Sequence, residues 1–179
     1  MRFFLLRFFK RFVNRFFKDG RKASPAFVFL LTLGICKVNA QVSFAPQVPY
    51  NVGESQYIAM DDFNGDGIQD LVMTIMYQDK ISVLLGVGDG TFSAPATYAT
   101  GLTPTSVSIA DFNADGDKDL AVINNSDADV TILLGNGDGT FHGNGNYGVN
   151  DTPIYSAAGD LNGDNKADLV VANYNGNNL

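Results

Sequence analysis

Residues 62–71 read Asp-Phe-Asn-Gly-Asp-Gly-Ile-Gln-Asp-Leu. The pattern returns at residues 111–120 as Asp-Phe-Asn-Ala-Asp-Gly-Asp-Lys-Asp-Leu, and at residues 160–169 as Asp-Leu-Asn-Gly-Asp-Asn-Lys-Ala-Asp-Leu. Each copy begins 49 residues after the previous one. A second landmark, Leu-Leu-Gly-x-Gly-Asp-Gly-Thr-Phe, keeps the same step between residues 84–92 and 133–141. Two landmarks in fixed register indicate an internal repeat, which is the first feature to establish in a sequence.

Each repeat has the pattern of short strands separated by turns. The apolar runs that follow the Asp-rich segments are typical of strands buried on both faces. The Gly-Asp-Gly segments supply the positive φ that a tight reversal needs. Four strands per repeat are therefore expected: the first at 57–60, 106–110 and 155–158, the second at 71–76, 120–124 and 169–173, the third at 81–85 and 130–134, and the fourth at 96–100 and 147–150.

Four strands in a repeat of about 40 to 50 residues are typical of a β-propeller blade. The predicted fold class is all-β: a partial β-propeller with blades at 55–100 and 104–150 and an incomplete blade at 153–179, about two and a half four-stranded blades. Residues 43–50 repeat the pattern of the outer strand and are expected to form one that has no blade of its own. Because a ring needs about 4 to 8 blades, we expect a truncated chain whose remaining blades lie in a missing C-terminal part. A small open stack closed by oligomerisation is the alternative, although its open edges would invite aggregation.

The N-terminal segment has the layout of a signal peptide. A long basic stretch precedes a short apolar run at 26–36, which is followed by Val38-Asn39-Ala40. This order of basic, apolar and small residues predicts a secretory signal at residues 1–40 and a mature domain at 41–179. The apolar run is shorter than the roughly 20 residues that span a bilayer, so a retained membrane anchor is the weaker interpretation. A mitochondrial transit peptide is a second, weaker alternative. We therefore expect the mature protein to be secreted or displayed at the cell surface.

The charges are divided unevenly along the chain. After residue 40 the only basic residues are Lys80, Lys118 and Lys166, against 18 acidic residues, which gives a net charge of −15. Such a domain is repelled by nucleic-acid phosphates and by anionic membranes, and it suits a cation. Neither a nucleic acid nor a membrane is therefore expected as a partner. The same region has no cysteine and a single histidine, His142, which excludes disulfides and zinc sites rich in Cys or His.

The Asp-rich segments are predicted to be metal-binding loops. Asp or Asn stands at positions 1, 3, 5 and 9 of each segment, and position 7 offers its backbone carbonyl. About five protein oxygens with flexible geometry suit Ca²⁺ better than Mg²⁺, which demands octahedral order. Position 6 is Gly67, Gly116 or Asn165, residue types that tolerate a left-handed turn. The predicted ligands of three Ca²⁺ ions, one per repeat, are Asp62, Asn64, Asp66, Ile68 and Asp70; Asp111, Asn113, Asp115, Asp117 and Asp119; and Asp160, Asn162, Asp164, Lys166 and Asp168.

A solvated Asp/Asn/Gly turn is the simpler interpretation of one such segment alone. Three segments that keep every ligand position favour metal binding, because crowded carboxylates without a cation repel one another. An EF-hand would need Glu at position 12 and flanking helices, whereas position 12 here is Met73, Val122 or Val171, each within an apolar run. The metal is thus expected to hold a β-hairpin loop and to contribute to its folding.

At these residues the sequence resembles the FG-GAP/VCBS repeat, the blade of propellers of the integrin α-subunit type. The resemblance rests on Asp-Phe-Asn-Gly-Asp-Gly-x-x-Asp-Leu followed by Leu-Leu-Gly-x-Gly-Asp-Gly-Thr-Phe, and it covers residues 43–179. It implies an extracellular, Ca²⁺-loaded propeller that serves adhesion or ligand binding, with an extracellular protein or a glycan as the partner.

Other chemistry has weaker support in the sequence. The Gly-rich segments at 86–90 and 135–139 lead into further strand and not into a helix, so they indicate turns and not phosphate binding. His142 has no Cys or Ser partner in view. We therefore expect a non-catalytic calcium-binding module. The alternatives are a fragment of a carbohydrate-active propeller enzyme similar to a polysaccharide lyase, whose catalytic base would lie outside this chain, and a lectin.

Overall fold

The structure, a computed structural model, describes residues 46–174, so the predicted signal peptide at 1–40 and residues 175–179 lie outside the described residues. The described part is almost entirely β, and its single helical element is the 3₁₀ turn η1 (Met76–Gln78). No helix among residues 46–174 is long and apolar enough to cross a membrane. The strands are β1 (Ser55–Asp61), β2 (Asp70–Ile75), β3 (Lys80–Leu84), β4 (Ala96–Ala99), β5 (Pro104–Ala110), β6 (Asp119–Asn124), β7 (Asp129–Gly135), β8 (Phe141–Gly148), β9 (Pro153–Gly159) and β10 (Asp168–Asn173).

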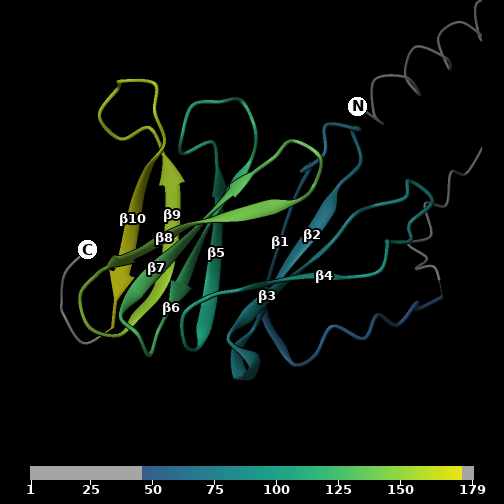
Figure 1. Cartoon of the computed structure of the whole chain (residues 1–179), viewed down its shortest axis with the longest axis horizontal. Helices are drawn as coiled ribbons and strands as arrows, with labels where there is room; N and C mark the ends of the chain where they lie inside the picture. The colour runs from purple at the N-terminus through teal and green to yellow at the C-terminus, as the bar shows by residue number, and fades with distance from the viewer. Residues whose placement is uncertain (1–45, 175–179) are drawn as a thin grey trace, which may run out of the picture. The chain divides into compact units, whose positions relative to one another are not determined.

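The strands form consecutive antiparallel sheets, as Figure 1 shows. Blade 1 has the order β1-β2-β3-β4 and blade 2 the order β5-β6-β7-β8. In the third unit the described residues contain β9 and β10, which pair with each other. These sheets confirm the predicted all-β fold of four-stranded units that repeat along the chain.

The second strand of each complete blade is an inner strand of its sheet and is buried on both faces. All six residues of β6 are buried, and so are five of the six residues of β2. Both strands read as near-continuous apolar runs in the sequence because each of their faces packs against a neighbouring layer. The sequence prediction for these strands is confirmed.

Adjacent blades pack face to face through alternating residues. Leu120 and Val122 of β6 join Val72 of β2 in one cluster between blades 1 and 2. The intervening residues Ala121 and Ile123 belong to a second cluster that contains Val171 of β10. Because successive side chains on a strand point to opposite faces, β6 contributes to both interfaces at once.

A tyrosine from the preceding segment packs against each complete blade, at the Phe that follows its Gly-Asp-Gly-Thr turn. The hydroxyl oxygen of Tyr98 in β4 accepts the N–H of Phe141 in β8 at 3.3 Å, and the two rings meet edge to face with centroids 5.6 Å apart. Tyr50 accepts the N–H of Phe92 at 2.8 Å, with the same 5.6 Å between ring centroids. Residues 46–50, the described part of the outer strand predicted at 43–50, lie in no strand, but Tyr50 makes on blade 1 the contact that Tyr98 makes on blade 2.

One predicted strand is placed differently by the structure. The fourth strand of blade 2 was expected at 147–150, whereas β8 runs from Phe141 to Gly148 and pairs with β7 over its whole length. Its Gly-rich sequence has the pattern of a turn, yet the ladder absorbs the irregularity as a register shift between Ile132 and Leu133. Gly145, at φ 109°, allows that distortion of the strand.

Replacing Tyr98 by Phe is expected to weaken the interface between blades 1 and 2. The ring stays, but the buried N–H of Phe141 loses its acceptor, and such a loss costs about 1 to 3 kcal/mol. Tyr147 is the matched control, because it follows Tyr98 by 49 residues and its side chain is exposed. Urea denaturation of Tyr98→Phe and Tyr147→Phe should show a clear loss only for the first; equal losses would contradict this account of the interface.

Candidate metal-binding loops

Three Asp-rich loops connect the first and second strands of the three units. Loop 1 (62–70) joins β1 to β2, loop 2 (111–119) joins β5 to β6, and loop 3 (160–168) joins β9 to β10. Figure 1 shows them along the same edge of the successive sheets. The ninth position of each loop is the first residue of the following strand.

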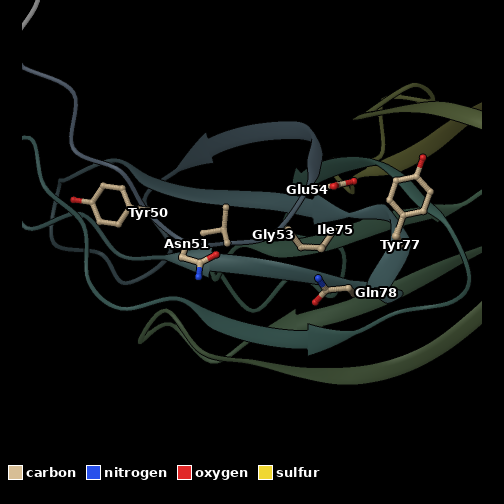
Figure 2. A pocket seen from close by; sticks show the side chains of 8 residues that line it. Tyr50, Asn51, Gly53, Glu54, Ile75, Tyr77 and Gln78 are labelled. Atoms are coloured by element: carbon tan, nitrogen blue, oxygen red, sulfur yellow. The ribbon is translucent and has the colours of Figure 1, made fainter.

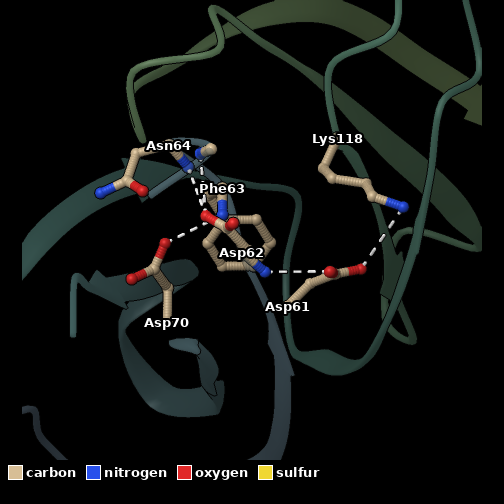
Figure 3. A network of polar contacts seen from close by, with 7 residues as sticks. Asp61, Asp62, Phe63, Asn64, Asp70 and Lys118 are labelled. Carbon is tan, nitrogen blue, oxygen red and sulfur yellow. Dashed lines mark hydrogen bonds and ion pairs between the residues drawn. The ribbon is translucent and has the colours of Figure 1, made fainter. Parts of the chain in front are cut away.

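The carboxylate at position 1 is the hub of each loop. Oδ1 of Asp62, Asp111 and Asp160 accepts the N–H of position 5 at 3.2 Å in all three loops. The other oxygen, Oδ2, accepts the N–H of position 6 at 2.8 to 2.9 Å. Figure 3 shows the surroundings of Asp62. The three loops therefore share one hydrogen-bonded frame, as their shared sequence predicts.

Positions 3 and 5 continue this frame with two short turns. The side-chain oxygen of Asn64, Asn113 and Asn162 accepts the N–H of position 5 at 2.8 to 3.0 Å. The carboxylate at position 5 in turn accepts the N–H of position 7 at 2.8 to 2.9 Å, donated by Ile68, Asp117 and Lys166. Asn and Asp favour such turns because their short side chains reach the backbone two residues further on. At position 7, the backbone carbonyl oxygen is the predicted Ca²⁺ ligand.

Position 6 adopts the left-handed conformation that the sequence predicts. The φ angles are 81° at Gly67, 96° at Gly116 and 65° at Asn165. Glycine reaches this region without steric cost, and asparagine is among the residues that tolerate it best. The reversal brings the N–H of this residue to the carboxylate at position 1.

The carboxylate at position 9 has a role that the sequence analysis missed. Asp70 is fully buried; its Oδ2 accepts the N–H of Phe63 at 2.9 Å, and its Oδ1 accepts the N–H of Gly86 at 2.7 Å. Asp119 is equally buried and accepts the N–H groups of Phe112 and Gly135 at 2.8 and 2.9 Å. Each of these carboxylates therefore ties position 2 of its loop to the end of the third strand.

A sequence signal for this role exists in the glycines. Gly86 follows Asp70 by 16 residues, and Gly135 follows Asp119 by the same distance. A Cβ atom at Gly135 would lie 2.3 Å from the carbonyl oxygen of Lys118, and one at Gly86 would lie 2.5 Å from that of Gln69. Only glycine allows the third strand to approach the loop this closely, so the paired glycines mark the contact.

Backbone N–H groups favour the ionised form of three loop carboxylates, those of Asp62, Asp115 and Asp160. The N–H of Gly67 is the main cause that lowers the pKa of Asp62 below its ordinary value, with further N–H donors from the same loop. The N–H of Asn165 does the same for the pKa of Asp160. At position 5, the N–H of Asp117 lowers the pKa of Asp115. Hydrogen bonds to the charged form favour it, so these groups carry negative charge at neutral pH.

The donor groups of each loop have the chemistry that Ca²⁺ requires. Carboxylates at positions 1 and 5, the Asn amide between them and a backbone carbonyl form a hard, all-oxygen set, which suits Ca²⁺ and not a thiolate- or imidazole-seeking metal. Within residues 46–174, no three His, Cys, Asp or Glu side chains form a metal-holding group by themselves. A cation in these loops would therefore need the Asn side chains, backbone carbonyls and water in addition to the carboxylates.

A lysine of loop 2 forms an ion pair with the residue that precedes loop 1. Nζ of Lys118, at position 8 of loop 2, is 3.7 Å from Oδ2 of Asp61, the last residue of β1. Figure 3 shows this ion pair next to loop 1. Both side chains are partly exposed, and exposed pairs of this kind contribute at most about 1 kcal/mol.

A sequence comparison agrees with this architecture. The model of the FG-GAP-like repeat matches residues 62–122 and 111–171, two spans that begin 49 residues apart and together cover more than half of the chain. The chain belongs to the FG-GAP-like repeat family. Each matched span starts at the first position of an Asp-rich loop, so these FG-GAP-like repeats follow the period of the structure. No curated protein matches the chain.

A hollow of about 650 Å³ lies elsewhere on blade 1 of this FG-GAP-like chain. Figure 2 shows its lining, which comes from residues 50–54 and from the far end of β2 with the turn η1. Glu54 is the one carboxyl group among the lining residues, and the lining includes no His, Cys, Ser, Lys or Arg. Loop 1 ends at Asp70, the first residue of β2, whereas the hollow is lined by Ile75, the last residue of that strand. Loop 1 and the hollow therefore lie at opposite ends of β2.

Replacing Asp70 by Asn is expected to destabilise the fold even when Ca²⁺ is chelated. An Asn side chain offers one acceptor oxygen where two N–H donors point, and an unpaired buried donor costs about 1 to 3 kcal/mol. Asp168→Asn is the control: Asp168 holds the same position in loop 3 and accepts the N–H of Leu161, but it is only half-buried. Thermal unfolding in EGTA measures both; an Asp70 variant as stable as wild type would refute the proposed role of this carboxylate.

The hydrogen bonds of the Gly-Asp-Gly-Thr turns can be tested through the pKa values of Asp89 and Asp138. The side chain and the N–H of Thr140 lower the pKa of Asp138, and Thr91 lowers that of Asp89 in the same way. Thr140→Val removes the hydroxyl donor, which is the larger cause, so the pKa of Asp138 should rise toward its ordinary value. Carboxyl ¹³C NMR titration measures this shift, with Asp89 in the same sample as the unchanged reference. An unaltered titration of Asp138 would contradict the assignment.

Proposed function

We infer that the chain is a secreted or cell-surface module of a β-propeller-like protein, in which Ca²⁺ holds one hairpin loop per repeat. The observation that carries this proposal is the repeated frame of the three loops. In each loop, carboxylates at positions 1 and 5 flank an Asn oxygen, and the hydrogen bonds that they accept from the backbone are the same within a few tenths of an ångström. Identical frames at three places are expected of a site with a common ligand.

The charge of the domain supports a cation as that ligand. Residues 41–179 carry a net charge of −15, and the Asp residues of the loops gather at one edge of the sheets. When bound, Ca²⁺ supplies positive charge that offsets the repulsion among these carboxylates. The loop residues supply the oxygen donors, and their backbone amides hold those donors in place before the ion arrives.

The proposed role of the module is adhesion or ligand binding, without catalysis. The partner would be an extracellular protein or a glycan, since a surface this acidic disfavours nucleic acids and anionic membranes. The basic, apolar and small-residue order of residues 1–40 supports export. Export would place the loops where Ca²⁺ is abundant. Turnover of an acidic polysaccharide by the purified chain would contradict the non-catalytic part of the proposal.

Calcium titration of the purified chain tests the proposal. We expect Ca²⁺ to raise the melting temperature, because a ligand at about 100 times its Kd stabilises the folded state by about 2.7 kcal/mol. Calorimetry should find about three ions per chain, and Asp66→Ala and Asp115→Ala should each remove about one. Asp89→Ala and Asp138→Ala are matched controls, since these residues lie in Gly-Asp-Gly turns outside the loops and should leave the stoichiometry unchanged. Melting that is the same in Ca²⁺ and in EGTA, with no heat of binding, would overturn the proposal.

A further inference from the structure

Phe63 makes one contact within loop 1 and two contacts with the neighbouring blade. Its N–H donates to Asp70 within the loop at 2.9 Å, and its carbonyl oxygen accepts the N–H of Gly139 in blade 2 at 3.0 Å. Its ring meets that of Phe141 edge to face, with centroids 5.4 Å apart and an interplanar angle of 78°. Phe63 is only 3% exposed. Position 2 of the loop is therefore also a part of the interface between the blades.

The same position in the other loops shows which of these contacts depends on a neighbour. The N–H of Phe112 and of Leu161 donates to position 9 at 2.8 and 3.0 Å, as that of Phe63 does. Phe112 is half-buried and packs against the cluster that contains Val171 of the third unit. Leu161 is 66% exposed. The bond within the loop is thus common to all three loops, whereas burial of the side chain follows the presence of a packed neighbour among the described residues.

The segment of blade 2 that contacts Phe63 is the turn between β7 and β8. Gly139 in this turn is buried at φ 83°, and a Cβ atom there would lie 2.6 Å from Leu85 of blade 1. Phe141, the first residue of β8, also packs against Tyr98 of blade 1. A Cβ atom at Gly137 would lie 2.7 Å from Oδ1 of Asp117 in loop 2. The turn therefore fits between blade 1 and the second loop with little room to move.

We propose that Phe63 is a positioning residue that couples metal occupancy of loop 1 to the order of residues 136–141 in blade 2. This inference rests on the proposed function, because it needs Ca²⁺ in loop 1. The two residues that flank Phe63, Asp62 and Asn64, are predicted ligands, so a bound ion fixes the backbone on both sides of it. The Phe63 carbonyl and ring then hold Gly139 and Phe141 in place. Such coupling between a site and a distant segment is reciprocal.

The test isolates loop 1 in the full chain. Asp115→Ala/Asp164→Ala leaves only loop 1 intact, and Asp66→Ala/Asp115→Ala leaves only loop 3 intact. Hydrogen exchange at the N–H groups of Gly139 and Phe141 is followed by NMR in Ca²⁺ and in EGTA, with Val72 of the β2 core as the internal reference for folding. In the first variant we expect Ca²⁺ to slow exchange at both groups by about fivefold or more, the lower end of usual coupling. In the second variant we expect no change.

A milder pair of variants addresses Phe63 itself. Phe63→Leu, which installs the residue type found at position 161, should reduce the Ca²⁺-dependent protection of Gly139 and Phe141 in the loop-1-only chain, while one ion still binds by calorimetry. Leu161→Ala in the same chain should leave that protection unchanged. Equal exchange with and without Ca²⁺, in a loop-1-only chain that binds one ion, would overturn the coupling and leave the proposed function standing. A wild-type chain that binds no Ca²⁺ would overturn both.

Discussion

The buried carboxylates of Asp70 and Asp119 are the constraint on which each complete blade depends. Each has no exposed surface, and each accepts one N–H from the start of its loop and one from the end of the third strand. A carboxylate without partners would be costly at such a site, so the loop and the strand must both be in place for the charge to be tolerated. These two hydrogen bonds fix the loop against the sheet. The third strand then lies so close to the loop that there is no space for a side chain at Gly86 or Gly135.

The arrangement of the loops follows from that attachment. Because position 9 begins the second strand, and position 2 is tied to it, the residues between them form a closed hairpin loop whose carboxylates at positions 1 and 5 stay accessible. Hydrogen bonds from the loop backbone favour the ionised form of Asp62, Asp115 and Asp160. Each complete blade therefore has carboxylates of two kinds. The one at position 9 is buried and holds the loop to the sheet, and those at positions 1 and 5 are accessible and can attract a cation.

Much of this architecture could be predicted from the sequence. The 49-residue period of the Asp-rich segments predicts four-stranded units, the apolar runs predict strands buried on both faces, and Gly67 or Asn165 predicts a left-handed residue at position 6; the structure confirms each of these. The buried role of Asp70 could not be predicted by spacing alone, because the regular 1, 3, 5, 9 pattern groups it with the accessible ligands. Its partner, the N–H of Gly86, comes from another strand, and only the folded chain brings the two together. β8 was misplaced for a related reason, since its Gly-rich sequence forms a strand only where β7 provides the ladder.

The most direct test of the central claim is hydrogen exchange at the N–H groups of Gly86 and Gly135 in wild-type protein stripped of metal. If the carboxylates of Asp70 and Asp119 hold these groups in the fold itself, both should exchange as slowly as the ladder N–H groups of β2 and β6, with no divalent ion present. Exchange at the rate of an open loop, in a chain whose β2 and β6 remain protected, would show that these bonds are not what fixes the loops to the sheets.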